Sequence, residues 1–128
     1  MRVLLDTCAF IWLTTDAPEL TANAKGIFQN PDNSIALSVV SIWEILVKHG
    51  IGKLALPEQS EIFISQQCEQ HRIDILPLNH TAVLQLGRLP SHRRDPFDRM
   101  LVCQAIEHEL TMLTPDHFIA QYPVATIW

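Results

Sequence analysis

The sequence predicts an α/β fold, a three-layer sandwich with a central parallel sheet between two layers of helices. Short apolar runs alternate along the chain with longer stretches of helical periodicity, the pattern typical of βαβ units. The short runs carry almost no charged side chains, as expected of strands covered on both faces. The chain has 128 residues, of which 48% are hydrophobic, so we expect one core and a single domain over residues 1–128.

The first half of the chain contains two apolar runs, each followed by a helical stretch. The first run ends at Asp6, and a helix follows. An Asn-Pro-Asp-Asn turn closes the second helix, and two glycines close the third, which we expect Ser41 to open. The expected elements are a strand over residues 3–5, helices over 9–13 and 20–29, a strand over 34–38 and a helix over 41–49.

The second half contains the best-marked helix of the sequence. Asp95 is a favoured N-cap and Pro96 a favoured first helical residue, and Phe97, Leu101 and Ala105 then share one face. The remaining expected elements are a helix over 61–71, a strand over 73–76, a short helix over 81–86, the marked helix over 96–107, and strands over 111–113 and 124–127.

Composition excludes several classes of protein. Fourteen acids against nine Lys and Arg residues give a net charge of −5, which argues against a surface that is one nucleic-acid patch. The longest apolar run covers residues 8–13, far below the roughly 20 residues that span a bilayer, so we expect no membrane segment and a cytoplasmic protein. The three cysteines show no CxxC spacing and the histidines no HxxxH spacing, which disfavours a disulfide frame or a zinc site.

Four acids stand just after a strand or at the start of a helix: Asp6, Glu44, Asp98 and Asp116. The carboxyl ends of parallel strands lie along one edge of a sheet, so these side chains are expected to converge there. Carboxylates that lie close together repel one another unless they are protonated or share a cation. Oxygen ligands are what Mg²⁺ and Mn²⁺ prefer, and this edge is therefore a predicted metal site.

Each acid also has a structural interpretation. Ser41 and Glu44 have the spacing of a capping box, and Asp95 followed by proline is typical of an N-cap. Asp98 would then be an acid of the first helical turn, favoured by the helix dipole. Asp6 and Asp116 could be N-caps as well. These interpretations explain each acid singly but not why four of them meet at one edge.

These segments resemble the successive motifs of PIN-domain ribonucleases, and the Asp-Pro-Phe-Asp-Arg stretch resembles the VapC-type toxins of bacterial toxin–antitoxin pairs. The resemblance runs from Val3 to about Tyr122. The motifs that carry it are Leu4-Leu5-Asp6-Thr7, Ser41-Ile42-Trp43-Glu44-Ile45 with Lys48, His92-Arg93-Arg94-Asp95-Pro96-Phe97-Asp98-Arg99, and Leu113-Thr114-Pro115-Asp116.

The resemblance implies an endoribonuclease that depends on Mg²⁺ or Mn²⁺ and acts as the toxin of a type II pair. It implies Asp6, Glu44 and Asp98 as the core catalytic and metal-binding acids, with Asp116 as a more variable fourth. Asp95 either reaches the metal through water or only caps its helix. The implied partners are an RNA substrate, a cognate antitoxin protein and a second copy of the chain in a homodimer.

Basic side chains near the acids are candidates for substrate binding. Lys48 stands four residues after Glu44, so it either forms a surface ion pair or holds a substrate phosphate. Arg93, Arg94 and Arg99 flank the acids, where they either contact RNA or form a solvated face; Arg99 is the candidate to contact RNA or to lock the site. We expect the aromatic residues Trp12, Trp43 and Phe97 to be core side chains.

Two other acidic α/β classes fit the sequence less well. A phosphoacceptor receiver domain needs two adjacent acids after its first strand and a late lysine, and this chain has one acid there and no lysine after Lys53. A haloacid-dehalogenase-type phosphatase needs Asp-x-Asp, which Asp6-Thr7-Cys8 does not provide. The remaining alternative is a catalytically silent PIN domain that acts as an RNA- or protein-binding module.

Overall fold

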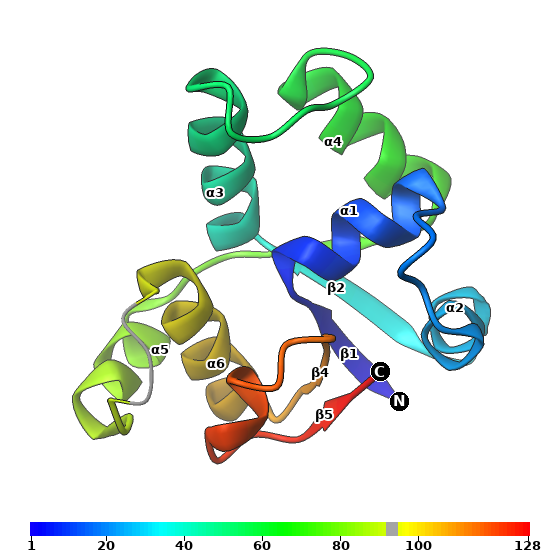
Figure 1. Ribbon diagram of the computed structural model, residues 1–128. Coiled ribbons are helices and arrows are strands. Elements are labelled where there is room, and N and C mark those ends of the chain that lie inside the picture. The colour runs from blue at the N-terminus through cyan, green and yellow to red at the C-terminus, as the bar shows by residue number, and fades with distance from the viewer. Residues whose placement is uncertain (92–94) are drawn as a thin grey trace.

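The structure is a computed structural model that describes residues 1–91 and 95–128. Within these residues a parallel five-stranded sheet forms the centre, with the strand order β3-β2-β1-β4-β5 (Figure 1). The strands are β1 (Arg2–Leu5), β2 (Ser34–Ser38), β3 (Asp74–Leu76), β4 (Thr111–Leu113) and β5 (Thr126–Ile127).

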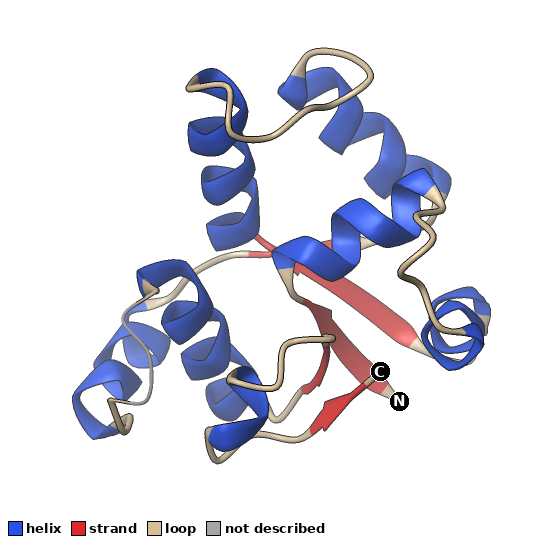
Figure 2. Ribbon diagram, viewed as in Figure 1, coloured by secondary structure: helices blue, strands red, loops and turns tan. Residues whose placement is uncertain are grey.

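Helices lie on both faces of this sheet, as Figure 2 shows by colour. They are α1 (Thr7–Thr15), α2 (Ala22–Gln29), α3 (Val39–Gly50), α4 (Ser60–Gln70), α5 (His80–Leu84) and α6 (Pro96–His108), with the 3-10 helices η1 (Gln85–Arg88) and η2 (Ile119–Gln121). The predicted three-layer α/β sandwich is confirmed. None of the helices in the described part of the chain has the length and apolar character needed to cross a membrane.

Successive side chains of the inner strands point to opposite faces of the sheet and pack into two separate hydrophobic cores. Val3 and Leu5 point to the face covered by α1, α2 and α4, where they pack with Phe10. Leu4 points to the opposite face and packs with Leu101 of α6. The edge strand β3 departs from the expected cover, because Asp74 and Ile75 are exposed.

Polar side chains fix where the helices begin. Asp6, Thr21, Ser38 and Asp95 each accept a hydrogen bond from main-chain amides two or three residues further on. These contacts satisfy amides that have no partner inside the helix. The N-cap interpretations of Asp6 and Asp95 are confirmed, and α1 begins at Thr7, two residues earlier than expected.

The capping-box interpretation of Ser41 and Glu44 is wrong. The N-cap of α3 is Ser38, whose side chain accepts from the Val40 amide at 2.9 Å, so Ser41 and Glu44 lie inside the helix and both are buried. Ser38 also donates to the buried amide oxygen of Gln104 in α6. This long-range contact favours Ser38 as the N-cap of α3, and the local sequence around Ser38 does not predict the contact.

Other expectations change in detail. The strand expected over 73–76 begins at Asp74, the last strand is shorter than expected, and the short helix continues as η1. Trp12 and Phe97 are partly buried, but Trp43 is 59% exposed, so its assignment to the core is wrong. Its one recorded ring contact in the described residues is with Phe97 of α6, and most of the indole faces solvent.

The register of the strands brings three polar residues to one edge. Leu5 of β1 stands opposite Leu37 of β2 and Leu113 of β4. The next residue of each strand or connection is Asp6, Ser38 or Thr114, at the carboxyl end of the sheet. This edge is where ligands bind in open parallel sheets.

Candidate active site

Asp6 is a buried carboxylate at the carboxyl end of β1, with 3% of its surface exposed. Its Oδ1 accepts from the Ala9 amide at 2.6 Å, and its Oδ2 accepts from the Thr114 hydroxyl. Burial raises the pKa of Asp6 to about 6, against the lowering effect of those two hydrogen bonds, and the negative charges of Asp116 and Glu44 raise it further.

Glu44 is the second buried carboxylate, 4% exposed, and it comes from the second turn of α3. The Thr7 hydroxyl lies 2.6 Å from Glu44 Oε1 and 2.9 Å from the Ser41 hydroxyl. A hydroxyl has one proton to give, so Thr7 donates to Glu44 and accepts from Ser41. The other oxygen, Oε2, accepts from the Lys48 ammonium.

Lys48 forms the ion pair with Glu44 that was one of its two predicted roles, and 40% of its side chain is exposed. Burial alone would lower the pKa of Lys48, but the hydrogen bond and charge of Glu44, with the charges of Asp95 and Asp98, raise it overall. The ammonium therefore stays charged at neutral pH. Its Nζ also lies 5.9 Å from the centre of the Phe97 ring.

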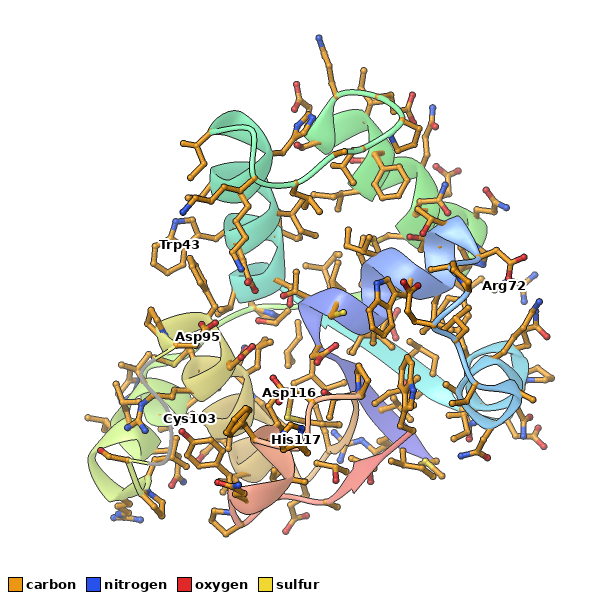
Figure 3. The ribbon with its side chains drawn as sticks, viewed as in Figure 1. Trp43, Arg72, Asp95, Cys103, Asp116 and His117 are labelled. Atoms are coloured by element: carbon orange, nitrogen blue, oxygen red, sulfur yellow. The ribbon has the colours of Figure 1, made fainter. Side chains whose placement is uncertain are left out.

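Asp95 and Asp98 begin α6 on the other side of Lys48. Asp95 Oδ1 accepts from the Phe97 amide at 2.9 Å and from the Asp98 amide at 3.2 Å, so this oxygen is engaged in capping. Asp116 lies on the loop after β4 (Figure 3), and its charge acts on Asp6. The Asp116 amide donates to Thr114 at 3.0 Å, and its Oδ1 accepts from the Phe118 amide at 2.9 Å. Asp116 therefore closes a tight turn and is not a helix N-cap.

The acids meet only in part. Asp6 senses the charges of Glu44 and Asp116, and the charge of Asp98 acts on Lys48 and on the thiol of Cys8. Within residues 1–91 and 95–128, no three His, Cys, Asp or Glu side chains stand close enough to form a finished metal site. The structure thus brings the predicted acids to one edge without gathering them around one point.

The pKa of the Cys8 thiol is affected by the negative charges at this edge of the sheet. Partial burial, and then the charges of Asp6 and Asp116, raise the pKa of its thiol to about 12. The thiol is therefore protonated at neutral pH and is a poor nucleophile. The surroundings of α1 at its N-terminus are strongly negative, which favours a cation there.

The arginines differ in how they relate to the site. Arg99 donates to the Pro90 carbonyl at 2.9 Å and to the Tyr122 hydroxyl at 3.3 Å, so it ties the segment before α6 to the C-terminal part of the chain. This geometry favours the locking interpretation of Arg99. Arg93 and Arg94 lie outside the described residues.

Three hydroxyl residues hold the acids of the site; the sequence motifs contained Thr7 and Thr114 without a role and Ser41 as a helix cap. Thr7 donates to Glu44 and is itself held by Ser41, and Thr114 donates to Asp6 while accepting from the Asp116 amide. A hydroxyl placed directly after an acid or a strand end is the signal that could have identified Thr7 and Thr114. For Ser41 no such signal existed, because its spacing from Glu44 favoured a cap.

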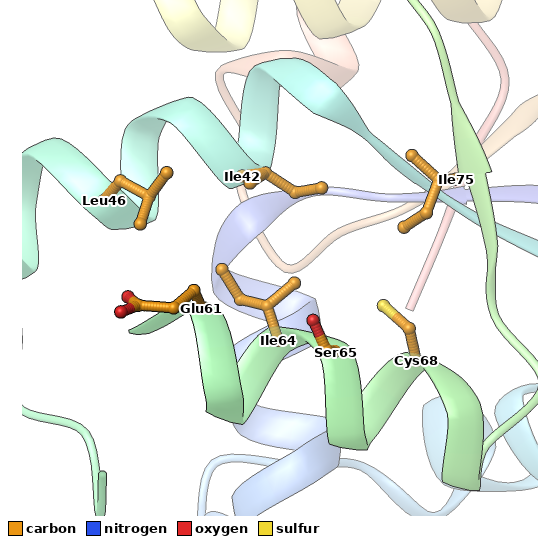
Figure 4. A pocket seen from close by; sticks show the side chains of 7 residues that line it. All are labelled: Ile42, Leu46, Glu61, Ile64, Ser65, Cys68 and Ile75. Carbon is orange, nitrogen blue, oxygen red and sulfur yellow. The ribbon is translucent and has the colours of Figure 1, made fainter. Parts of the chain in front are cut away.

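A concave feature that none of the proposed site acids lines lies between α3, α4 and β3. It is an apolar groove of about 330 Å³. Figure 4 shows its lining side chains, which are Ile42, Leu46, Glu61, Ile64, Ser65, Cys68 and Ile75. Ile75 of the edge strand β3 is itself exposed to solvent.

Known proteins match nearly the whole chain. The family model described as PIN domain matches residues 3–124. Ribonuclease VapC16 of Mycobacterium tuberculosis is 34% identical over 67 residues, which is 49% of this chain and 48% of that protein. The matched segment thus spans about half the length of this relative.

Solved structures share the fold along almost all of its length. VapBC2 from Rickettsia felis, bound to a DNA fragment from its promoter, matches with a TM-score of 0.75 and 18% identity, covering 99% of this chain and 98% of that one. VapBC-1 from nontypeable Haemophilus influenzae matches with a TM-score of 0.67 and 19% identity over 99% and 97%. VapBC-5 from Mycobacterium tuberculosis, a member of the VapBC family of toxin–antitoxin systems, matches with 0.61 and 21% over 98% and 95%. The predicted membership of the PIN domain family is confirmed by the family model, and the solved VapBC structures confirm the fold.

Proposed function

The chain belongs to the PIN domain family, and from that premise we propose that it is a metal-dependent endoribonuclease acting as the toxin of a toxin–antitoxin pair. We further propose that residues 1–128 act as a single domain. The similarity to ribonuclease VapC16 and the shared fold with VapBC proteins support this function.

The observation that carries the proposal is the burial of two carboxylates beside a third. Asp6 and Glu44 are both almost fully buried, and Asp116 adds its charge, so that the pKa of Asp6 is raised to about 6. Such a cluster weakens the fold, since burial and mutual repulsion both disfavour the charged state. A divalent cation at this edge would offset the loss of stability caused by burial and repulsion. Binding such a cation is therefore a functional explanation for the cluster.

The donor set suits Mg²⁺ or Mn²⁺, because every proposed ligand is a carboxylate oxygen. We propose that Asp6, Glu44 and Asp98 hold the ion, with Asp116 as the outer acid. When bound, the ion would activate water and relieve the charge that develops on the phosphate during phosphodiester hydrolysis. The ion would compete with the Lys48 ammonium for the charge of Glu44 Oε2.

The chain's own polar groups orient and receive the substrate. Thr114 and the amide at the start of α1 fix the Asp6 carboxylate, and Thr7 with Ser41 fixes that of Glu44. Lys48, once released from Glu44, is placed to hold a substrate phosphate as a point charge. Arg93 and Arg94 are proposed substrate contacts as well, and Arg99 is proposed to act by tying Pro90, before α6, to Tyr122.

Cleavage of a single-stranded RNA by the purified chain tests this function. We expect cleavage with Mn²⁺ or Mg²⁺ that stops in excess EDTA, with 5′-phosphate and 3′-hydroxyl products, and an Asp98→Asn variant prepared in parallel should be inactive. Cleavage that continues in EDTA would refute the metal mechanism. RNA binding without cleavage by either protein would instead support the silent binding module.

We propose that an antitoxin protein blocks this site and also occupies the apolar groove between α3 and α4. A basic side chain of the antitoxin would pair with the buried carboxylates through charge-assisted hydrogen bonds and so compete with the cation. An amphipathic segment of the same partner suits the apolar lining of the groove. Since coupled binding is reciprocal, the antitoxin-bound chain should bind Mn²⁺ more weakly than the free chain in a titration. Equal affinities would mean that the antitoxin acts without reaching the acids.

We also propose a homodimer formed through α5 and η1. Val83, Leu84 and Leu86 expose 39%, 67% and 37% of their surfaces within a few residues of one another. Clustered apolar side chains of this kind are typical of protein interfaces, while single ones are common on any surface.

A further inference from the structure

Trp43 presents an open aromatic surface at the start of α3. Its indole contacts the Phe97 ring of α6, with the ring centres 4.8 Å apart and the planes at 72°. In an edge-to-face contact at least one face of the indole is left uncovered by its partner. With 59% of its surface exposed, Trp43 has room for a flat group on that face. Figure 3 shows it on the outer side of α3, above the start of α6.

This aromatic pair is joined to the acidic site through one side chain. Trp43 directly precedes Glu44, and Phe97 directly precedes Asp98. The Lys48 ammonium pairs with Glu44 and also lies 5.9 Å from the Phe97 ring centre. A continuous path therefore leads from a buried carboxylate, through a cation, to the two aromatic rings.

The packing of the fold does not explain why Trp43 is aromatic. The helices α3 and α6 are already held together by buried groups, among them Val40 and the contact between Ser38 and Gln104. By contrast, Trp12 is partly buried and packs against Trp128 with ring centres 6.0 Å apart, as a structural tryptophan does. Trp43 contributes an exposed ring that packs on Phe97, the ring over which the Lys48 ammonium lies.

We propose that Trp43 and Phe97 form a stacking site for one unpaired nucleobase of single-stranded RNA, next to the phosphate that Lys48 holds. The inference rests on the proposed function and adds a binding site to it. An aromatic face beside a cation matches the base and the phosphate of a single nucleotide. Stacking accepts every base, so this site selects for unpaired RNA and not for a particular sequence.

Binding of short oligonucleotides tests the site. The probes are a fluorescein-labelled single-stranded octamer of adenosine and an octamer of the same length without bases. Both are titrated with Mn²⁺ present in the Asp98→Asn background, which prevents cleavage. Adding Trp43→Ala should weaken binding of the adenosine octamer by about 5- to 150-fold, the range found when a stacking side chain is truncated. Trp43→Phe should retain most of the affinity, and binding of the baseless octamer should not change.

Ile51→Ala is the matched control, because Ile51 is a 62% exposed apolar residue at the end of the same helix. It should leave both affinities unchanged. Equal binding of the adenosine octamer with and without Trp43 would overturn the inference, while metal-dependent cleavage by the unmodified chain would leave the proposed function standing. A loss of affinity that coincides with a change from dimer to monomer in sedimentation would also overturn it, since Trp43 would then be a self-contact.

Discussion

Replacing Asp6 by asparagine should stabilise the metal-free protein at neutral pH. The carboxyl of Asp6 has a pKa of about 6 in the fold against 3.8 in the unfolded chain, chiefly because it is buried. In this pH window the folded state holds the proton more tightly, so the free energy of unfolding falls as the pH rises from 3.8 to 6. At 1.36 kcal/mol per pKa unit, the full penalty is about 3 kcal/mol at pH 7.5.

The asparagine keeps the shape and the helix cap without the charge. Its side-chain oxygen can still accept from the Ala9 amide, and the Thr114 hydroxyl can turn to accept from the new amide group. We therefore expect Asp6→Asn to be more stable than the unmodified chain by about 1 to 3 kcal/mol at pH 7.5. At pH 5 the gain should be smaller by about 1.5 kcal/mol, because the native carboxyl is then mostly protonated.

Urea unfolding in EDTA at the two pH values measures both quantities. Asp74→Asn is the control, because it makes the same substitution at an exposed position on β3. Adding Mn²⁺ should reverse the order at pH 7.5, since a ligand that binds only the folded state stabilises it by mass action and the asparagine binds it less well. The reasoning would be refuted by an asparagine variant less stable in EDTA at pH 7.5, or by a gain that does not depend on pH.

The remaining predictions concern the other side chains of the site and the assembly. Asp98→Asn and Glu44→Gln should abolish RNA cleavage, whereas Asp95→Asn, which keeps a good N-cap, should retain much more activity in the same assay; equal loss in Asp95→Asn would assign Asp95 to the metal. Lys48→Met should tighten Mn²⁺ binding by about 3- to 10-fold in a spectroscopic titration, with Lys53→Met as the control, because a partly exposed charge-assisted hydrogen bond to Glu44 is removed. Unchanged affinity would mean that Lys48 does not compete with the ion. Sedimentation at micromolar concentration should show a dimer that Leu84→Glu converts to a monomer, and a monomer from the unmodified chain would contradict the proposed interface.

The sequence predicts best those features that local chemistry decides. Asp95 followed by proline marks the start of α6, and the apolar run before Asp6 marks β1, because both depend on residues within one helical turn. Local chemistry did not predict the correct start of α3. Ser38 and Ser41 are both suitable N-caps, and the contact of Ser38 with Gln104, 66 residues away, distinguishes them.

Trp43 illustrates a second limit of sequence patterns. Helix α3 is apolar on several sides, with Val40 and Ile45 buried and Trp43, Leu46 and Val47 exposed. Periodicity alone cannot say which of these stripes faces the core, because each satisfies helical spacing. The decision depends on where α6 and β1 lie, and thus on the tertiary structure.

The buried carboxylates of the site lower the stability of the metal-free protein. The carboxylates that weaken the apo fold are the same ones that a divalent cation or an antitoxin side chain would neutralise, so either ligand must stabilise the protein as it binds. Lys48 already neutralises Glu44 from within, whereas Asp6 is held by the neutral donors Ala9 N–H and Thr114 O–H. The proposed cation and the proposed antitoxin would thus compete for a charge that the fold leaves incompletely balanced, and the buried charge of Asp6 would favour the binding of either.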